Sequence, residues 1–198
     1  LCGAWDFSFD PDDVGRTAQW YEPDHRYDRT IIVPYPWESL AAWGMEAAAG
    51  PEQFASDNIY LQPEQINSEN RLSAPRHTIG WYRTEIRVPD EWNDRATILH
   101  IGAADWAVEV YLNGNRVGGR ESGYLPLEFD LTDHLRQDEN VLCIRVEDPQ
   151  DDAERPVGKQ HNWYTTTSGI WQPVWLQPRP TAHIRHLRFT NCIADHTV

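Results

Sequence analysis

The chain has little cysteine, and it has no long hydrophobic run and no common catalytic motif. Its 198 residues include three Cys, at Cys2, Cys143 and Cys192, and no C-x-x-C pair. An odd number of widely spaced cysteines indicates neither a disulfide framework nor a zinc site. No apolar stretch approaches the roughly 18 residues of a membrane-spanning helix, and G-x-S-x-G, phosphate-loop and H-E-x-x-H motifs are absent. We therefore expect no metal, no cofactor and no membrane partner.

Positive charge is also scarce. Lys and Arg number 17 against 31 Asp and Glu, which gives a formal net charge of -14. A surface this acidic repels phosphate groups, so nucleic acid is not an expected partner. The acidic residues gather in turns such as DPDD at 10–13 and DPQDDAE at 148–154. We interpret them chiefly as solvated loops, with an acid-lined site for a cation or a sugar as the alternative.

The chain starts at Leu1, without a Met and without the basic and apolar leader of a signal peptide. We interpret this start as that of a processed or excised piece, which does not identify the compartment. The lack of an N-x-S/T sequon removes one sign of secretion, so a soluble cytoplasmic protein is slightly favoured.

The sequence is rich in period-2 alternation of apolar and polar residues. In WYRTEIRV at 81–88, one face of the strand carries Tyr82, Ile86 and Val88, and the other face carries charged residues. AVEVYL at 107–112 repeats the pattern, and the Asn-Gly pair after it favours a two-residue hairpin turn. The other expected strands are 4–9, 30–33, 96–101, 127–131, 141–147, 170–176 and 183–189.

Helix patterns are weak by comparison. Thr132 is the expected N-cap of a short turn over 131–137, and the Ala-rich segment 41–49 is a second candidate. Many short strands separated by Pro, Gly, Asn and Asp predict an all-β antiparallel sandwich, of which the jelly roll is one form. Residues 38–79 have few strand patterns, and a connection of that length usually carries a function or an interface.

Several motifs follow one another in the order found in a known family. They are W-Y-R at 81–83, L-H-x-G-A-x-D-W at 99–106, V-Y-L-N-G-x-x-V-G at 110–118, S-G-Y-x-P-x-x-F-D-L-T at 122–132 and S-G-I-W-Q-P-V-W-L at 168–176. With these motifs the chain resembles the N-terminal sugar-binding domain of glycoside hydrolase family 2, the family of β-galactosidases, β-glucuronidases and β-mannosidases. The resemblance covers nearly all of 1–190, although residues 40–79 match no pattern of the family.

The resemblance implies a jelly-roll β-sandwich of the galactose-binding-domain type over residues 1–189. Residues 190–198 are then a linker or the start of an immunoglobulin-like domain, which in the family precedes a TIM barrel with two catalytic Glu. Retaining glycosidases need two carboxylates about 5 Å apart. In this family the acid/base Glu follows an Asn, and the chain has no Asn-Glu dipeptide. We therefore expect no catalytic residue in this chain, and a chain that is inactive by itself.

The resemblance also implies where a substrate is contacted. The segment KQHNWYTTTS at 159–168 lacks alternation, and in family members this connection reaches toward the sugar pocket of the barrel. The candidate substrate-binding residues in it are Lys159, Gln160, Asn162, Trp163 and Tyr164. Asp105 and Trp106 are further candidates for the same rim, although a turn-capping role is the commoner one for such an Asp.

Three functions fit these residues. The first is a non-catalytic domain of a glycosidase that cleaves β-glycosides with retention; this domain would pack on the barrel and help to recognise carbohydrate. The second is an autonomous lectin-like carbohydrate-binding module, which should present a solvent-open aromatic platform. The third is a purely structural domain whose partner is the rest of its own enzyme. Trp171 and Trp175 are expected in the core or in an interdomain contact.

Overall fold

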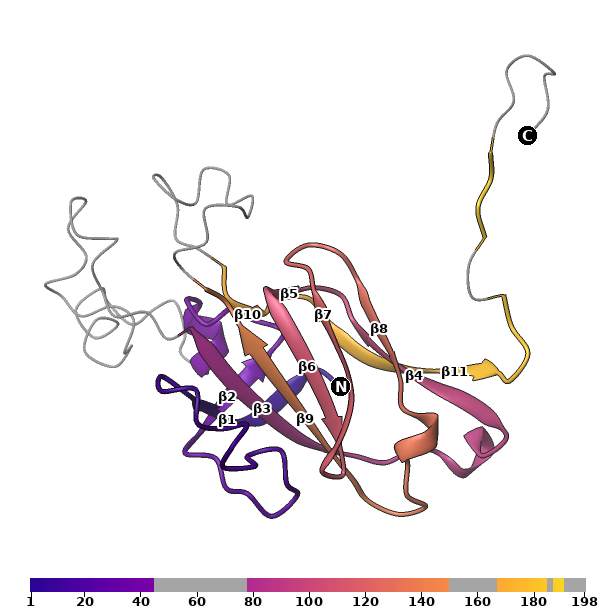
Figure 1. Ribbon diagram of the computed structural model, residues 1–198, viewed down its shortest axis with the longest axis horizontal. Coiled ribbons are helices and arrows are strands. Elements are labelled where there is room, and N and C mark those ends of the chain that lie inside the picture. The colour runs from indigo at the N-terminus through magenta and orange to yellow at the C-terminus, as the bar shows by residue number, and fades with distance from the viewer. Residues whose placement is uncertain (45–77, 150–166, 185–186, 191–198) are drawn as a thin grey trace, which may run out of the picture.

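The computed structural model describes residues 1–44, 78–149, 167–184 and 187–190, and these ranges form antiparallel strands and short 3-10 helices (Figure 1). The strands are β1 (Gly3–Phe9), β2 (Arg29–Val33), β3 (Ile79–Ile86), β4 (Arg95–Ile101), β5 (Ala104–Asp105), β6 (Ala107–Leu112), β7 (Asn115–Glu121), β8 (Leu127–Asp130), β9 (Asn140–Glu147), β10 (Gly169–Ile170) and β11 (Val174–Pro180). A six-stranded sheet has the order β2-β1-β3-β9-β6-β7, a three-stranded sheet has the order β11-β4-β8, and β10 pairs with β5.

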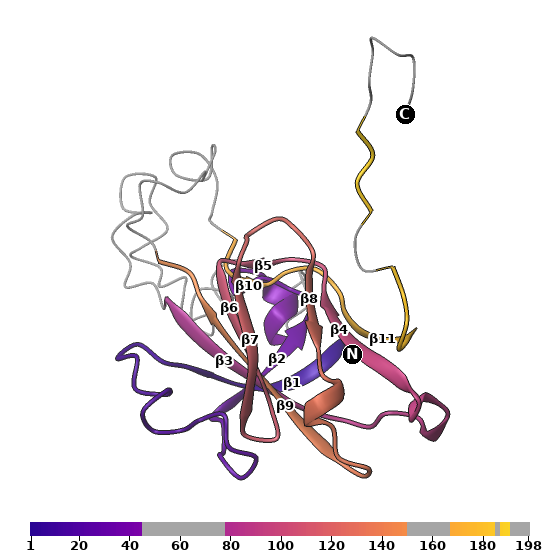
Figure 2. The ribbon, with the colours of Figure 1, turned by 45° about the vertical axis from the view of Figure 1, so that its right-hand side comes forward.

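The two larger sheets enclose the main hydrophobic core. Figure 2 shows β4, β8 and β11 on one side and β3, β6 and β7 on the other. Buried side chains from both sheets meet between them, among them Phe7, Leu99, Val110, Ile144 and Val174. This packing of two antiparallel sheets confirms the predicted all-β jelly-roll sandwich.

Most predicted strands lie within two residues of the observed ones. The prediction for 170–176 is wrong in part, because the strand is interrupted between β10 and β11. The N–H groups of Trp171 and Gln172 both donate to the carbonyl of Ala103, and the next residue, Pro173, has no N–H to donate. No strand forms in the described part of 183–189, and β7 was not predicted because two glycines interrupt its alternation.

The outer face of the six-stranded sheet carries a second hydrophobic cluster. Trp81, Tyr111 and Cys143 point away from the main core and are buried, and Trp20 and Tyr21 pack against them. The ring of Tyr21 stacks on that of Tyr111 at 4.6 Å. Cys143 is therefore a small buried hydrophobe, as its sequence context predicts, and burial raises the pKa of its thiol to about 11.

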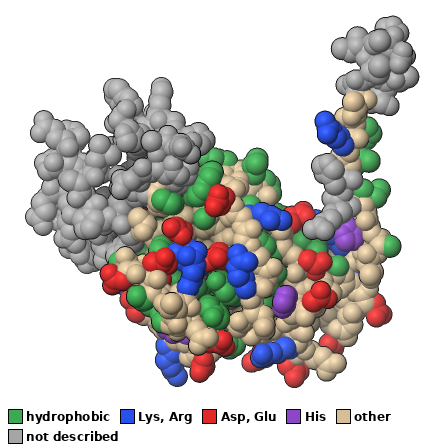
Figure 3. All heavy atoms as spheres, in the orientation of Figure 1, with side chains coloured by type: hydrophobic (Ala, Val, Ile, Leu, Met, Phe, Trp, Pro, Cys, Tyr) green, Lys and Arg blue, Asp and Glu red, His purple; other side chains and the backbone are tan. Residues whose placement is uncertain are grey.

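Charged side chains of both signs are interspersed on the exposed face of this sheet (Figure 3). They surround Arg145, whose side chain is fully buried and bonds to Glu147 at 2.7 Å and to Asp13 at 2.8 Å. Arg16 donates to Glu109 at 2.8 Å beside them. Asp13, Glu109 and Glu147 therefore lie in compensated ion pairs on this face.

The predicted hairpin turn after β6 is present. Asn113 and Gly114 both have positive φ, +54° and +84°, as a type I′ turn requires. The side chain of Asn113 accepts a bond from the Val141 N–H at 2.9 Å and donates to the side chain of Asn140 at 2.8 Å. The turn is thus tied to the start of β9.

Asn140→Ala is expected to lower the free energy of unfolding by about 2 to 3 kcal/mol. The side chain of Asn140 is fully buried, and its amide bonds to Asn113 and to backbone groups of Arg136 and Asp138. Alanine would leave these buried groups without their partner. Urea denaturation followed by Trp fluorescence measures the loss. Asn115→Ala, at the exposed start of β7, is the control, and an equal loss in both variants would refute this explanation.

The short helices are 3-10 turns at Leu40–Trp43, Asp90–Trp92 and Thr132–His134. The prediction that Thr132 is an N-cap is wrong, because the residue in that position is Leu131 and no side chain caps the turn. The Thr132 hydroxyl instead accepts a bond from the Thr97 N–H at 3.0 Å and donates to Asp130 at 2.5 Å. Thr132 therefore connects β4 to the end of β8.

Candidate functional site

The predicted site residues divide into two groups. Lys159, Gln160, Asn162, Trp163 and Tyr164 lie outside the described residues, whereas Asp105 and Trp106 are described. The described residues nearest to the first group in sequence lie at the end of the sandwich where β5 pairs with β10 (Figure 1). We call this the loop end, and define it as residues 37–38, 105–106, 122–125, 148 and 167–171.

Asp105 is nearly buried at the loop end. It pairs with Gly169 across the β5–β10 ladder, and its carboxylate packs against the backbone of Gly123. Trp106 is half-buried, and its peptide groups bond to the carbonyl of Glu147 and to the N–H of Ser122. The structure therefore brings Asp105 to β10, which follows the 159–168 segment, whereas Trp106 is bonded to the end of β9 and to Ser122. Their contact with a sugar stays a prediction.

Aromatic side chains border the same end. Tyr124 is 50% exposed and Leu125 68% exposed. The ring of Tyr124 meets Trp171 edge to face at 6.0 Å, and the Trp171 indole N–H donates to the Gly123 carbonyl at 2.9 Å. About half of the Tyr124 side chain is therefore in contact with solvent. An exposed apolar rim of this kind is typical of an interaction surface.

Two carboxylates share one hydroxyl at the loop end. The Oγ of Ser168 lies 2.7 Å from Oε1 of Glu38 and 2.7 Å from Oδ2 of Asp148, and the Ser168 N–H donates to Oε2 of Glu38 at 3.1 Å. A hydroxyl has one proton and can donate only once. One carboxyl group must therefore be protonated and donate to Ser168. Burial raises the pKa of Glu38 to about 7, so this carboxyl group keeps a proton below neutral pH.

Backbone hydrogen bonds of the residues around this carboxylate pair join several chain segments. The N–H of Asp148 donates to the carbonyl of Thr78 at 2.7 Å, and the N–H of Trp37 donates to the carbonyl of Ser168 at 3.1 Å. The start of β3, the end of β9, the 37–38 turn and the start of β10 are thus joined. The sequence does not predict this role of Glu38, because Asp148 and Ser168 lie 110 and 130 positions away.

Beneath the pair, Tyr82 organises a buried hydrogen-bond cluster. Its hydroxyl accepts bonds from the indole N–H of Trp37 at 2.5 Å and from the N–H of Ile170 at 3.1 Å. Burial raises the pKa of Tyr82 above its ordinary value, so the phenol stays neutral. Gly169 passes over this cluster with φ at +82°, a backbone conformation that favours glycine.

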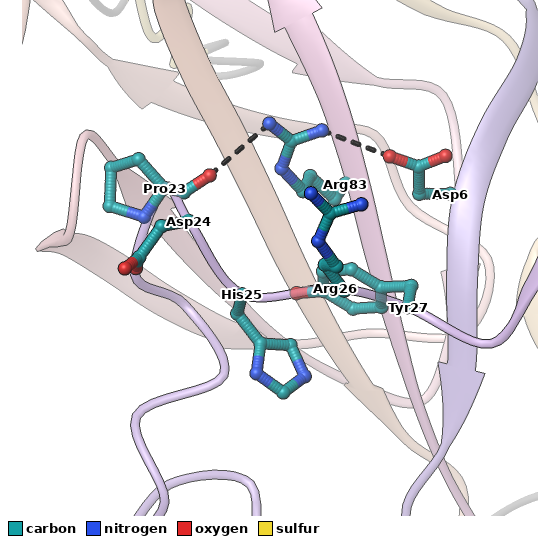
Figure 4. A pocket seen from close by; sticks show the side chains of 7 residues that line it. All are labelled: Asp6, Pro23, Asp24, His25, Arg26, Tyr27 and Arg83. Carbon is teal, nitrogen blue, oxygen red and sulfur yellow. Dashed lines mark hydrogen bonds and ion pairs between the residues drawn. The ribbon is translucent and has the colours of Figure 1, made fainter.

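A separate polar pocket of about 450 Å³ lies on the outer face of the six-stranded sheet (Figure 4). Arg83 sits between two of its walls and donates to Asp6 at 2.9 Å and to the Pro23 carbonyl at 3.2 Å. The lining has two Asp and two Arg, so its charges balance. Among the described residues, no group of three or more His, Cys, Asp or Glu is placed to hold a metal ion.

Comparison with known proteins identifies the family. The model of the family described as "Glycosyl hydrolases family 2, sugar binding domain" matches residues 1–180, and this range ends at the last residue of β11. The chain belongs to this family. The resemblance found in the sequence motifs is thereby confirmed. None of the helices in the described ranges is long and apolar enough to cross a membrane.

Relatives of the family 2 domain are much longer proteins. The chain is 25% identical to a β-galactosidase of Priestia megaterium over 93% of the chain and 17% of that protein. It is 28% identical to the β-galactosidase large subunit of Leuconostoc lactis over 94% of the chain and 30% of that protein. A solved Ruminococcus gnavus β-glucuronidase shares the fold with a TM-score of 0.63 at 20% identity, over 91% of the chain and 29% of that structure. The chain therefore spans less than a third of each.

Proposed function

We propose that this family 2 domain is a non-catalytic part of a longer glycoside hydrolase that cleaves β-glycosides with retention. In that enzyme it packs on a catalytic TIM barrel and contributes to substrate recognition. The observation that supports this most strongly is the family match over 1–180 together with the small share of each relative that the chain spans. Residues 190–198 are proposed to be the linker to, or the start of, an immunoglobulin-like domain.

The carboxylate pair at the loop end is not suited to glycoside cleavage. A retaining glycosidase also has two carboxyl groups near one another, and one of them has a raised pKa. Here the space between Glu38 and Asp148 is filled by the Ser168 hydroxyl, which bonds to both. A glycosidic oxygen cannot reach both groups while Ser168 occupies that position. We therefore propose that the pair positions the chain segments and takes no part in catalysis.

Exposed apolar side chains support packing against further domains. Tyr124 and Leu125 form the rim of the loop end, and Leu187 and Phe189 are largely exposed beyond β11. Large apolar side chains in solvent are typical of surfaces that other domains cover. The loop end would then face the barrel, with the 159–168 segment as one wall of the sugar pocket. Ser168, the last residue of this segment, is held in place by hydrogen bonds to two side chains.

The test compares the 198-residue chain with the longer enzyme that we propose contains it, using 4-nitrophenyl β-galactoside and β-glucuronide. The chain alone should hydrolyse neither.

In the longer enzyme, Trp163→Ala should lower kcat/KM at least about tenfold, mainly through KM, because a stacking surface for the substrate is lost. Trp92→Ala, in the Asp90–Trp92 turn, is the matched control and should stay within about twofold. Hydrolysis by the chain alone, or an unchanged kcat/KM in Trp163→Ala, would contradict the proposal.

A further inference from the structure

Trp175 stands out on the outer face of the three-stranded sheet. Its neighbours in β11, Val174 and Leu176, pack in or against the main core, whereas the side chain of Trp175 is 41% exposed. Sequence analysis expected this residue in the core or in an interdomain contact. An exposed indole on a regular strand is costly to leave in water, and such residues commonly mark binding surfaces.

The indole of Trp175 is held in a fixed orientation. It pairs with His100 across the β11–β4 ladder, and the two rings stack at 4.8 Å with an angle of 2° between their planes. His100 is buried, and its Nε2 lies 2.9 Å from Oε1 of Gln177. One face of the indole is therefore covered by a ring that is itself anchored. Its exposed surface is presented without the entropy loss that ordering a free side chain would require.

Planar polar groups lie beside the stacked rings. Arg179 forms a bidentate pair with Glu128, at 2.7 and 2.9 Å, and its Nε donates to Oε1 of Gln177 at 3.1 Å. Glu128 also lies opposite His100 in the β4–β8 ladder. We call this set the Trp175 platform; it consists of His100, Glu128, Trp175, Gln177 and Arg179. Its members come from three adjacent strands, β4, β8 and β11 (Figure 2).

From this arrangement we infer that the Trp175 platform binds a neutral pyranose unit of an oligosaccharide. One face of a pyranose carries C–H groups, and its burial against an indole removes apolar surface from water. The hydroxyl groups around the ring both donate and accept, and they match the exposed Gln177 amide and the Arg179–Glu128 pair. Because this pair has no net charge and the chain carries -14, an anionic ligand is disfavoured.

The composition of β11 argues against a peptide partner. β11 is an edge strand of its sheet, where an extended peptide would add by backbone hydrogen bonds. Pro178 and Pro180 have no N–H to donate and so interrupt such a ladder. The ligand therefore meets the face of the sheet, where the indole lies. This site goes beyond the proposed function, because all of its residues belong to the described sandwich and none to the 159–168 segment.

The experiment is a titration of the 198-residue chain, followed by intrinsic Trp fluorescence and by calorimetry. The probes are methyl β-galactoside, methyl β-glucoside and a neutral β-linked tetrasaccharide, with glucuronic acid as the charged comparison. A neutral saccharide should give saturable binding. Trp175→Ala should weaken it at least about tenfold, and Trp175→Tyr should recover most of the loss, because an aromatic face is restored. Gln177→Ala should weaken binding about threefold or more while leaving the stacked rings in place.

The controls separate this inference from the proposed function. Trp92→Ala should bind as the wild type does, Trp163→Ala reports any binding by the 159–168 segment, and thermal unfolding of every variant verifies that it is folded. Loss of binding in Trp163→Ala with retention in Trp175→Ala would overturn the Trp175 platform and leave the proposed role of the 159–168 segment intact. A folded wild-type chain that binds no neutral saccharide would also overturn it. Neither result bears on the kcat/KM comparison that tests the proposed function.

Discussion

Gly169→Ala is expected to lower the free energy of unfolding by about 3 to 5 kcal/mol. Gly169 has φ at +82°, where a side chain is strained. An added Cβ would also lie 2.2 Å from Nε1 of Trp37 and 2.4 Å from the hydroxyl of Tyr82. Both rings are fully buried among other aromatic residues, so neither can withdraw without opening the core. Urea denaturation of the chain measures the loss.

Gly44→Ala is the matched control for this substitution. Gly44 has a similar φ of +70°, but an added Cβ would meet no atom of the described residues within 4 Å. Gly44→Ala should therefore lower the free energy of unfolding only by the cost of a positive φ, about 1 to 2 kcal/mol. The difference between the two variants reports the crowding over the Trp37–Tyr82 hydrogen bond. Equal losses would show that the tight packing of Gly169 on this pair does not contribute.

The second large effect expected is a dependence of stability on pH through Glu38. Its pKa is raised by burial from 4.5 to about 7, so the folded chain keeps a proton that the unfolded chain releases above pH 4.5. Stability from this group is fully present below pH 4.5 and is lost as the pH rises to about 7. A shift of this size corresponds to about 3 kcal/mol for an enclosed group. Because Glu38 is only half-buried by surface area, we expect about 2 kcal/mol.

Glu38→Gln should remove this dependence, because glutamine has the shape and hydrogen-bonding pattern of protonated glutamic acid. Its carbonyl can accept from the Ser168 N–H, and its NH₂ group can donate to the Ser168 hydroxyl, which then donates to Asp148. The variant should match the wild type at pH 4.5 and exceed it in stability at pH 8. Urea denaturation midpoints at pH 4.5, 6, 7 and 8 measure this difference.

Glu91→Gln is the control for general charge effects, since Glu91 is an exposed acid in the Asp90–Trp92 turn. It should leave the difference between pH 4.5 and pH 8 unchanged. If Glu38→Gln were less stable than the wild type at pH 8, the ionised carboxylate would be the form that the fold uses, and the protonated bridge to Ser168 would be refuted.

The motifs in the sequence located most of the fold and the family. Alternation at 107–112 gave the bounds of β6, and the Asn113-Gly114 pair gave the turn that follows it. Both features depend on neighbouring residues, whose side chains alternate by geometry alone. The interruption between β10 and β11 was missed, because it depends on bonds to Ala103 on another strand. Thr132 was predicted to cap its own turn, because its bond to Thr97 on β4 does not depend on neighbouring residues.

The candidate site also combines features that neighbouring residues indicate with features that depend on distant segments of the chain. The 159–168 segment stays a prediction from its composition and from the resemblance to the family. The carboxylate pair on Ser168 was not predicted, because Glu38 and Asp148 come from distant segments and meet only when β9 and β10 are in place. The residues next to Glu38 in the sequence do not indicate a raised pKa, because residues far away in the chain bury its carboxyl group.

The sequence by itself determined most of the strands, the antiparallel sandwich and the membership of glycoside hydrolase family 2, because these depend on alternation and on ordered motifs along the chain. Only the tertiary structure decided which side chains meet. It stacked Trp175 on His100 at the surface and brought Glu38 and Asp148 to the hydroxyl of Ser168. Such contacts depend on strand order and register, and a pattern of neighbouring residues specifies the face of a strand but not its partner.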